Sequence, residues 1–345
     1  MKIIDEAMTE LERAFRSSLD KLEAMAKTTP ILQEISREPR FLTAALERYI
    51  RTPGALDRGN YPVVGIELAL TPWFGLTANC WIPHPDRVTN LSTKAVHHHG
   101  PLLLNTVTIF GPGYEHWMFT TPEAIDEANQ LYRMELIEAA PHPKHHVAFV
   151  GANIPHTPFF PPDLTVTLAL FSNSKPTSLI DRMKRLPGVR GNEAKLRSAA
   201  LKLGLLKALD LKVPDFYDFY PAIDGFRVMP QRDEFQRGPN ADHIASLFYT
   251  IQGTGNEALA PVIREQLEKG MIGAGRATVE KLLPDLENGR PIEGRLSDFH
   301  YATPHANFTR QDIEQALLAV ASKETHASQF PAAADNQEAP RTVTA

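Results

Sequence analysis

Between about residues 61 and 175 the sequence consists of short segments rich in Val, Ile, Thr and aromatic residues, separated by Pro and Gly. Such segments are typical of β-strands bounded by turns. The predicted strands are 63–70, 74–82, 94–110, 131–139, 146–154 and 164–172. Because no long helical pattern lies between them, the spacing favours a β-barrel or jelly roll over an alternating parallel sheet. Only the stretch 122–130 is expected to add one or two helical turns.

Both flanks of this β-rich region are predicted to be helical. Apolar residues at spacings of three, four and seven predict one helix over 4–27; Pro30 then interrupts the chain, and a second helix follows over 39–51. The helices predicted on the C-terminal side are 193–211, 240–252, 256–269, 275–287 and 309–322, the last opening on a capping box at Thr309–Asp312. The sequence therefore predicts an α+β protein with an N-terminal helical segment at 1–60, a barrel at 61–175, a helical region at 176–322 and a disordered tail at 323–345.

The composition limits the partners and the compartment. The formal net charge is −5, and like charges do not form blocks of five or more, so neither nucleic acid nor a membrane is an expected partner. Cys80 is the only cysteine, which excludes an intrachain disulfide and a Cys-rich metal site and favours a reducing compartment. The first 30 residues lack a signal-peptide pattern, and no stretch approaches the roughly 20 apolar residues of a membrane span. We therefore expect a cytoplasmic protein that acts on a small molecule.

Histidines give the strongest chemical signal in the chain. His97, His98 and His99 are consecutive on a predicted strand, and His156 follows the apolar run 147–150 on another. Successive side chains on a strand point to opposite faces, so His97 and His99 share a face and His98 points away, in a structural role. Imidazole is the commonest protein ligand for transition metals. The pattern predicts a metal site to which His156 could bring the third ligand.

Motifs on both sides of these histidines follow the order found in a known family. They are Cys80-Trp81 at a strand end, a loop from Pro83 to Thr93, the histidine triplet, the turn at Gly111, the strand 146–150, His156 and the alternating strand Leu164–Leu170. With these motifs the sequence resembles the cupin superfamily and, within it, the cysteine dioxygenase (thiol dioxygenase) branch, over half of the chain at most. The resemblance implies a mononuclear Fe(II) held by His97, His99 and His156, with O2 as co-substrate. It also allows a homodimer.

Departures from the family's pattern bear on the ligand set and on the substrate. Leu103 and Leu104 occupy the window in which most metal-binding cupins place a glutamate, so a neutral three-histidine site is expected, as in thiol dioxygenases. The family's tyrosine near the iron has no obvious equivalent, because 171–173 read Phe-Ser-Asn. The basic residue that binds the substrate carboxylate is expected to be Arg58 or Arg87.

Other histidines offer alternatives. Glu115 and His116 follow the turn 111–113 and form a candidate acid/base pair, although charged residues also occur in turns without a role. His142, His145 and His146 are expected in a loop that crosses solvent, and they would be the next ligand set if the first held no metal.

The leading functional hypothesis is a thiol dioxygenase-like Fe(II) oxygenase. The alternatives are a redox-neutral metal-dependent cupin, acting as isomerase, lyase or hydrolase with Glu115 or His116 moving the proton, and a non-catalytic binding protein.

Overall fold

The structure is a computed structural model that describes residues 2–57, 63–84, 90–93, 96–173, 217–230, 240–293 and 308–327. Arg58, Arg87, the predicted helix 193–211 and the tail beyond 327 lie outside these residues. Among the helices described, none combines the length and the hydropathy needed to cross a membrane.

Three helices open the chain. They are α1 (Lys2–Arg16), α2 (Lys21–Arg37) and α3 (Phe41–Ile50). The prediction of one helix over 4–27 is wrong, because Asp20 starts a new helix: its carboxylate accepts a hydrogen bond from the backbone N–H of Glu23, 2.9 Å away. The Glu23 carboxylate in turn accepts from the N–H of Leu19 at 2.7 Å. Pro30 does not interrupt the chain as predicted but lies inside α2.

The β-rich region forms two antiparallel sheets. The five-stranded sheet has the order β1 (Val64–Leu70), β2 (Phe74–Trp81), β11 (Thr165–Ser172), β4 (Leu104–Phe110), β9 (Val147–Val150). The eight-stranded sheet has the order β6 (Glu123–Asp126), β7 (Leu131–Arg133), β13 (Gly225–Pro230), β12 (Tyr217–Ala222), β3 (Val96–His97), β10 (His156–Pro158), β5 (Tyr114–Phe119), β8 (Leu136–His142).

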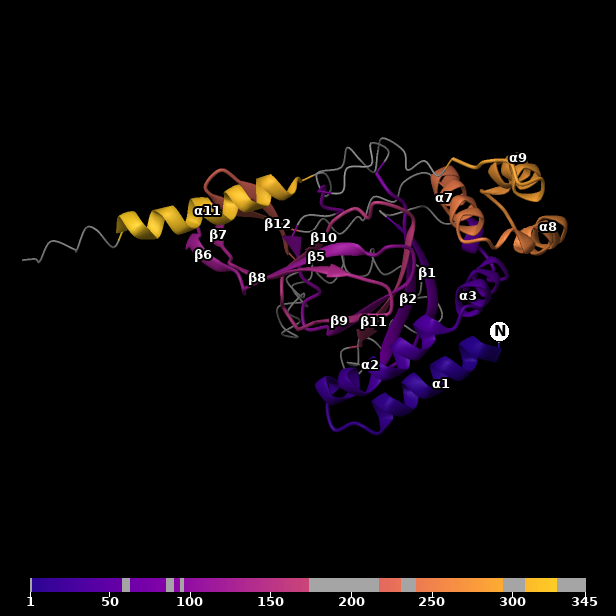
Figure 1. Cartoon of the computed structure of the whole chain (residues 1–345), viewed down its shortest axis with the longest axis horizontal. Coiled ribbons are helices and arrows are strands. Elements are labelled where there is room, and N and C mark those ends of the chain that lie inside the picture. Colours follow the sequence, from indigo (N-terminus) through magenta and orange to yellow (C-terminus); the bar gives the residue numbers. More distant parts are fainter. Residues whose placement is uncertain are drawn as a thin grey trace, which may run out of the picture.

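The strand order within the two sheets defines a jelly roll. Strands β2, β11, β4 and β9 are neighbours in one sheet, and β3, β10, β5 and β8 are neighbours in the other. Along the chain, the strands of each half are interleaved with those of the other, as in the two Greek keys of a double-sheet jelly roll. Figure 1 shows the two curled sheets facing each other, with helices on both flanks. The predicted α+β fold with a central jelly roll and flanking helices is confirmed.

Several elements differ from the sequence predictions. The predicted strand 94–110 is divided into β3 and β4, because the chain crosses from one sheet to the other between them, through Gly100 at a φ of +57°. The stretch 122–130 is not helical; it contains β6 and a turn. The region expected to be helical beyond 176 contains the β12–β13 hairpin, in which Asp218 pairs with His97.

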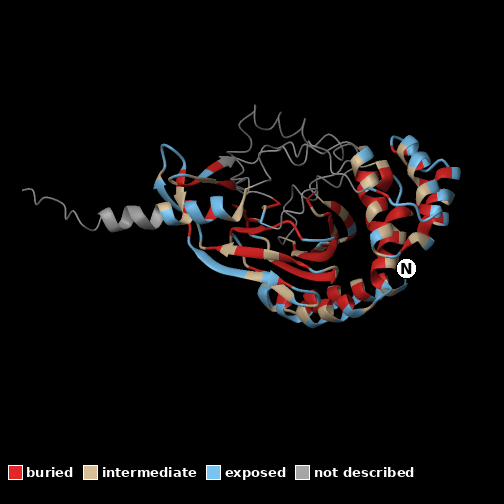
Figure 2. Ribbon diagram, turned by 45° about the horizontal axis from the view of Figure 1, so that its top comes forward, coloured by how far each residue is buried: buried red, intermediate tan, exposed pale blue. Residues whose placement is uncertain are grey.

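Helices cover the outer faces of both sheets. The largest core joins α1–α3 and the C-terminal helices α7 (Asn240–Gly253), α8 (Ala260–Glu268) and α9 (Arg276–Glu287) to β1, β2, β4 and β11. The short 3-10 turns η1 (Ala55–Asp57) and η2 (Glu257–Leu259) belong to the same assembly. A second core packs α11 (Arg310–Ala327) against β5, β12 and β13. Figure 2 shows buried residues along both sheets and on the inner sides of the helices.

The inner faces of the sheets carry polar and aromatic side chains. Along β11, Val166 and Leu168 point into the helix-covered core, while Thr167 and Phe171 point the other way. The indole Nε1 of Trp81 donates to the Thr167 hydroxyl at 2.8 Å inside the barrel. This interior is where the predicted metal ligands lie.

Candidate metal centre

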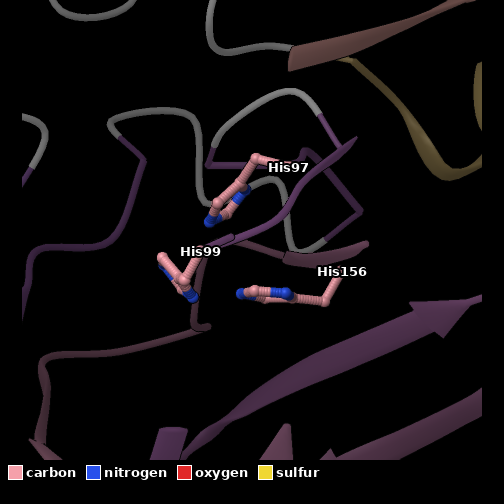
Figure 3. Close-up of side chains that lie close together, drawn as sticks. All are labelled: His97, His99 and His156. Atoms are coloured by element: carbon pink, nitrogen blue, oxygen red, sulfur yellow. The ribbon is translucent and has the colours of Figure 1, made fainter. Parts of the chain in front are cut away.

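The structure brings His97, His99 and His156 together. His97 ends β3, His99 lies two residues further on, and His156 opens β10, directly opposite His97 in the antiparallel pairing of these strands. The ring centroids are 4.5 Å apart for His97 and His156, 4.7 Å for His99 and His156, and 5.1 Å for His97 and His99. Figure 3 shows the three rings converging on one point. One nitrogen from each ring lies within 4.8 Å of the other two.

Local contacts set the orientation of His156. Its Nδ1 lies 3.0 Å from the carbonyl oxygen of Ile154, which can only accept, so Nδ1 carries the proton. The Nε2 lone pair is then the ligand atom, in the way that outer hydrogen bonds fix the tautomer of metal-binding histidines. His97 and His156 are buried and His99 is partly exposed, so the cluster is largely shielded from water.

The donor set fits a divalent transition metal. Nitrogens bound to one ion at about 2.1 Å are at most about 4.2 Å apart, so a small rotation of the rings would bring these atoms to bonding distance. Within the described residues the group contains neither a carboxylate nor a thiolate. Leu104, in the window of the usual cupin glutamate, packs instead with Val150 and Ala169. Three neutral imidazoles leave the full charge of a bound ion to attract an anionic substrate.

A fourth histidine borders the cluster. His116 lies on β5, is 6% exposed, and has its ring centroid 5.2 Å from that of His156. Burial lowers the pKa of His116 well below its usual value, and the neighbouring imidazoles of His156 and His142 lower it further. The ring of His116 therefore stays neutral and can accept a hydrogen bond beside the predicted ligands.

Glu115 is not brought to the cluster. On β5 it alternates with His116, so it points to the outer face, where it accepts hydrogen bonds from Trp117 Nε1 at 2.6 Å and from the Arg310 guanidinium. His98 also turns away from the other two members of the triplet. Its Nδ1 accepts from the N–H of Gly100 at 3.0 Å, and its side chain is buried.

His142 is a buried interior residue, so the expectation that it lies in a loop crossing solvent is wrong. It lies on β8, 2% exposed, stacked on Tyr114 at a centroid distance of 5.0 Å. Its Nε2 donates to the Thr106 carbonyl and its Nδ1 accepts from the Thr108 hydroxyl, both at 3.0 Å. Burial lowers the pKa of His142 to about 4 and raises that of Tyr114 to about 12. The flanking prolines favoured a loop, so the sequence offered His142 only as an alternative ligand and gave no sign of its burial.

The other predicted residues lie apart from the cluster. His145 bonds to the Ser36 hydroxyl at 3.0 Å and ties the loop to α2, while His146 is exposed. Phe171 of β11 packs edge-on against His99 at a centroid distance of 5.0 Å. It supplies an aromatic ring there without a hydroxyl.

No family model matches the sequence, and no curated protein matches it. Similar solved structures include TT1209 from Thermus thermophilus, with 14% identity, 34% of this chain and 90% of that chain covered, and a TM-score of 0.24. An uncharacterized conserved protein with a double-stranded β-helix domain from Klebsiella pneumoniae has 11% identity, 37% and 85% coverage, and a TM-score of 0.23.

A structure described as that of the DMSP lyases RdDddP and RnDddQII has 16% identity, 51% and 96% coverage, and a TM-score of 0.24. Similarity at these levels says nothing about function, and the jelly roll is defined by the strand order of the two sheets.

Proposed function

We propose that this chain binds one Fe(II) through His97, His99 and His156 and uses O2 to oxidise a small substrate, in the manner of a thiol dioxygenase. The observation that supports the proposal is the convergence of three imidazoles, with no carboxylate among the described residues of the group, at two adjacent strands of a jelly roll. The identity of the metal and the thiol substrate come from the resemblance of the sequence to that family.

Each residue has a distinct part in this proposal. Iron held by His97, His99 and His156 would supply the redox chemistry by which O2 oxidises the substrate. The pairing of β3 with β10 fixes His97 opposite His156, and the Ile154 carbonyl holds His156 in the ligating tautomer. The atoms balance as one thiol and one O2 giving a sulfinic acid, so that the sulfur gains both oxygen atoms and the proton leaves the sulfinate; the neutral ring of His116 is placed to accept a hydrogen bond beside the reacting group. The burial of His97 and His156 limits the access of water to the site.

A redox-neutral reaction is the second candidate, and the position of His116 favours it. A neutral base beside a metal acting as a Lewis acid is also the arrangement of isomerases and lyases. Glu115 takes no part in this version, because it points to the outer face of β5. Consumption of O2 together with substrate separates the two reactions.

Metal analysis tests the proposal first. The wild type and the variants His97→Ala, His99→Ala and His156→Ala would be purified without oxygen and without a tag, and their metals measured by elemental analysis. We expect about one iron per chain in the wild type and its loss in all three variants. His98→Ala is the matched control, since His98 belongs to the same triplet but turns away from the other two rings.

The outcomes separate the three functional readings. Iron in the wild type and in His98→Ala, together with O2 uptake in the presence of thiols, supports the oxygenase. Iron or another metal without O2 uptake supports the redox-neutral enzyme. Metal retained by the three ligand variants, or none in the wild type, would leave the non-catalytic binding protein as the better hypothesis.

A further inference from the structure

Residues 308–310, at the start of α11, lie beside the segment 90–93 that leads into β3. The backbone N–H of Ser92 donates to the carbonyl of Phe308 at 2.6 Å, and that of Arg310 donates to the carbonyl of Asn90 at 2.9 Å. These bonds flank an antiparallel bridge between the two segments. The first turn of the C-terminal helix is therefore joined to the chain just before the first two predicted metal ligands.

The opposite side of segment 90–93 lies against β10 and the residues that follow it. The N–H of Thr93 donates to the carbonyl of Pro158 at 2.9 Å, and the N–H of Phe160 donates to the carbonyl of Leu91 at 2.7 Å. Segment 90–93 thus lies between 308–310 and the strand that carries His156. Backbone bonds connect the C-terminal helix to this ligand through one intermediate segment.

The side chain of Arg310 makes a second connection, across the outer surface of the sheet. Its guanidinium carbon lies 5.6 Å from the ring centroid of Trp117 on β5 and 5.5 Å from that of Phe159, directly after β10. It also forms an ion pair with Glu115 at 2.5 Å, and Trp117 Nε1 donates to the same carboxylate. One guanidinium therefore contacts side chains from β5 and from the end of β10, the strand that carries His156.

The alternation of β5 places this contact directly behind the candidate site. Glu115 and Trp117 point outward to Arg310, while His116, between them, points inward to His156. Moving β5 relative to β10 would move His116 relative to His156. The contacts of Arg310 with Glu115, Trp117 and Phe159 on the outer face, called the Arg310 clamp below, therefore affect the distance between His116 and His156 on the inner face.

We propose that Arg310 is a positioning residue: it fixes β5 against β10 from outside and so holds His156 and His116 in place for the metal site. This inference rests on the proposed function. It also gives a role to Glu115, which the sequence suggested as a proton carrier: Glu115 anchors the guanidinium.

Loss of the Arg310 clamp is expected to lower the metal affinity of the site more than it lowers the stability of the whole protein. The side chains of Arg310 and Glu115 are 37% and 30% exposed, and ion pairs at this exposure contribute little to the free energy of unfolding. A change in metal affinity without a comparable change in melting temperature would therefore be the signature of positioning.

The test compares Arg310→Gln with the wild type, with Arg310→Lys and with a matched control. Arg264→Gln is the control, because Arg264 pairs with Glu287 at the same distance of 2.5 Å and similar exposures of 46% and 29%, but on α8 and α9. The probes are the affinity and visible absorption of bound Co(II), the melting temperature, and backbone hydrogen exchange at Thr93 and Phe160.

We expect Arg310→Gln to bind Co(II) about tenfold more weakly, the lower end of what loss of outer contacts costs a metal site. Its Co(II) spectrum should change, and exchange at Thr93 and Phe160 should become faster. Arg310→Lys, which keeps the charge opposite Glu115, should recover part of the affinity. The melting temperature of Arg310→Gln should stay close to that of Arg264→Gln.

Three results would overturn the inference. Unchanged Co(II) affinity and exchange in Arg310→Gln, with tight binding in the wild type, would remove the role of Arg310 and leave the proposed function intact. A fall in melting temperature well beyond that of the control, without recovery in Arg310→Lys, would show a general structural role. Failure of the wild type to bind Co(II) would overturn the proposed function, and the inference with it.

Discussion

At the scale of single residues, the interior of the barrel gathers ionisable side chains that burial keeps uncharged. His116, His142 and Tyr114 lie on two paired strands, and burial is the first cause of the shifted pKa of each. His142 is the member whose pKa can be tested apart from the metal, because its two ring nitrogens bond to Thr106 and Thr108 and not to the cluster.

His142 makes the stability of the protein depend on pH. Its pKa is about 4 in the folded protein and about 6.5 in the unfolded chain, so between these values the unfolded state binds the extra proton. The contribution is fully present above pH 6.5 and is lost as the pH falls from 6.5 through 4, by about 3 kcal/mol. Urea unfolding of the wild type and of His142→Gln across this range measures it. Parallel curves for the two proteins would contradict the prediction.

The sequence carried enough information to predict the three histidines but not the role of their neighbours. Strand alternation predicted that His97 and His99 share a face, and the two rings do lie together, although β3 ends at His97 and His99 lies beyond the strand. The same alternation separates Glu115 from His116, once the residues after the turn are known to form a strand. His142 could not be predicted, because its burial depends on β8 pairing with β5.

At the scale of elements, the turn between β4 and β5 decides where the inward residues of β5 begin. Gly111 has a φ of +83°, and a Cβ added there would lie 2.1 Å from the carbonyl oxygen of Leu164. Glycine is therefore required twice over, by the left-handed backbone and by the close approach of the chain just before β11.

Replacing Gly111 with Ala should destabilise the protein far more than the same change at Gly54. Gly54 has a similar φ of +72° with nothing within 4 Å of the added Cβ, so Gly54→Ala isolates the backbone cost of about 1 kcal/mol. Gly111→Ala adds a backbone collision, and we expect a loss of about 3 kcal/mol or more. Chemical denaturation of both variants measures the difference. Equal losses would show that the turn relaxes without cost.

Elements with their own sequence signals were predicted well, and those that depend on distant partners were not. The strands β1, β2 and β11 follow the apolar alternation of their residues. The hairpin β12–β13 was missed because β12 completes a sheet edge at β3, about 120 residues earlier, which no local pattern reveals. The separation of α1 from α2 was missed because the capping signal of Asp20 lies within an unbroken apolar period.

At the scale of the whole molecule, the N-terminal and C-terminal helices share one core with the outer face of a sheet. Phe15 of α1 stacks on Phe74 of β2 at 5.3 Å, and Phe248 of α7 belongs to the same buried cluster. The Tyr49 hydroxyl of α3 bonds to His243 of α7 at 3.0 Å. The domain limits at 60, 175 and 322 remain a prediction, and this shared core indicates that the parts unfold together.

The variant Phe248→Ala tests whether the helices and the β-rich region unfold together. Phe248 is fully buried, so the cavity should cost about 3–5 kcal/mol. The three tryptophans lie at 73, 81 and 117, so fluorescence reports on the β-rich region, while far-UV circular dichroism reports mainly on helices. We expect both urea transitions to shift together. Leu318→Ala, at an exposed position, is the control. A shift in circular dichroism alone would indicate an independent helical domain.

The order in which this fold can be completed during synthesis follows from the pairing of segment 90–92 with 308–310. Leu91 bridges Thr309, which the ribosome adds 218 residues later (309 − 91). At roughly 5–20 residues per second, that interval lasts roughly 10–40 s. During this interval the segment 90–92, which precedes His97 and His99, lacks the residues 308–310 with which it pairs. A nascent chain therefore contains all three imidazoles well before it contains the segment that pairs with residues 90–92.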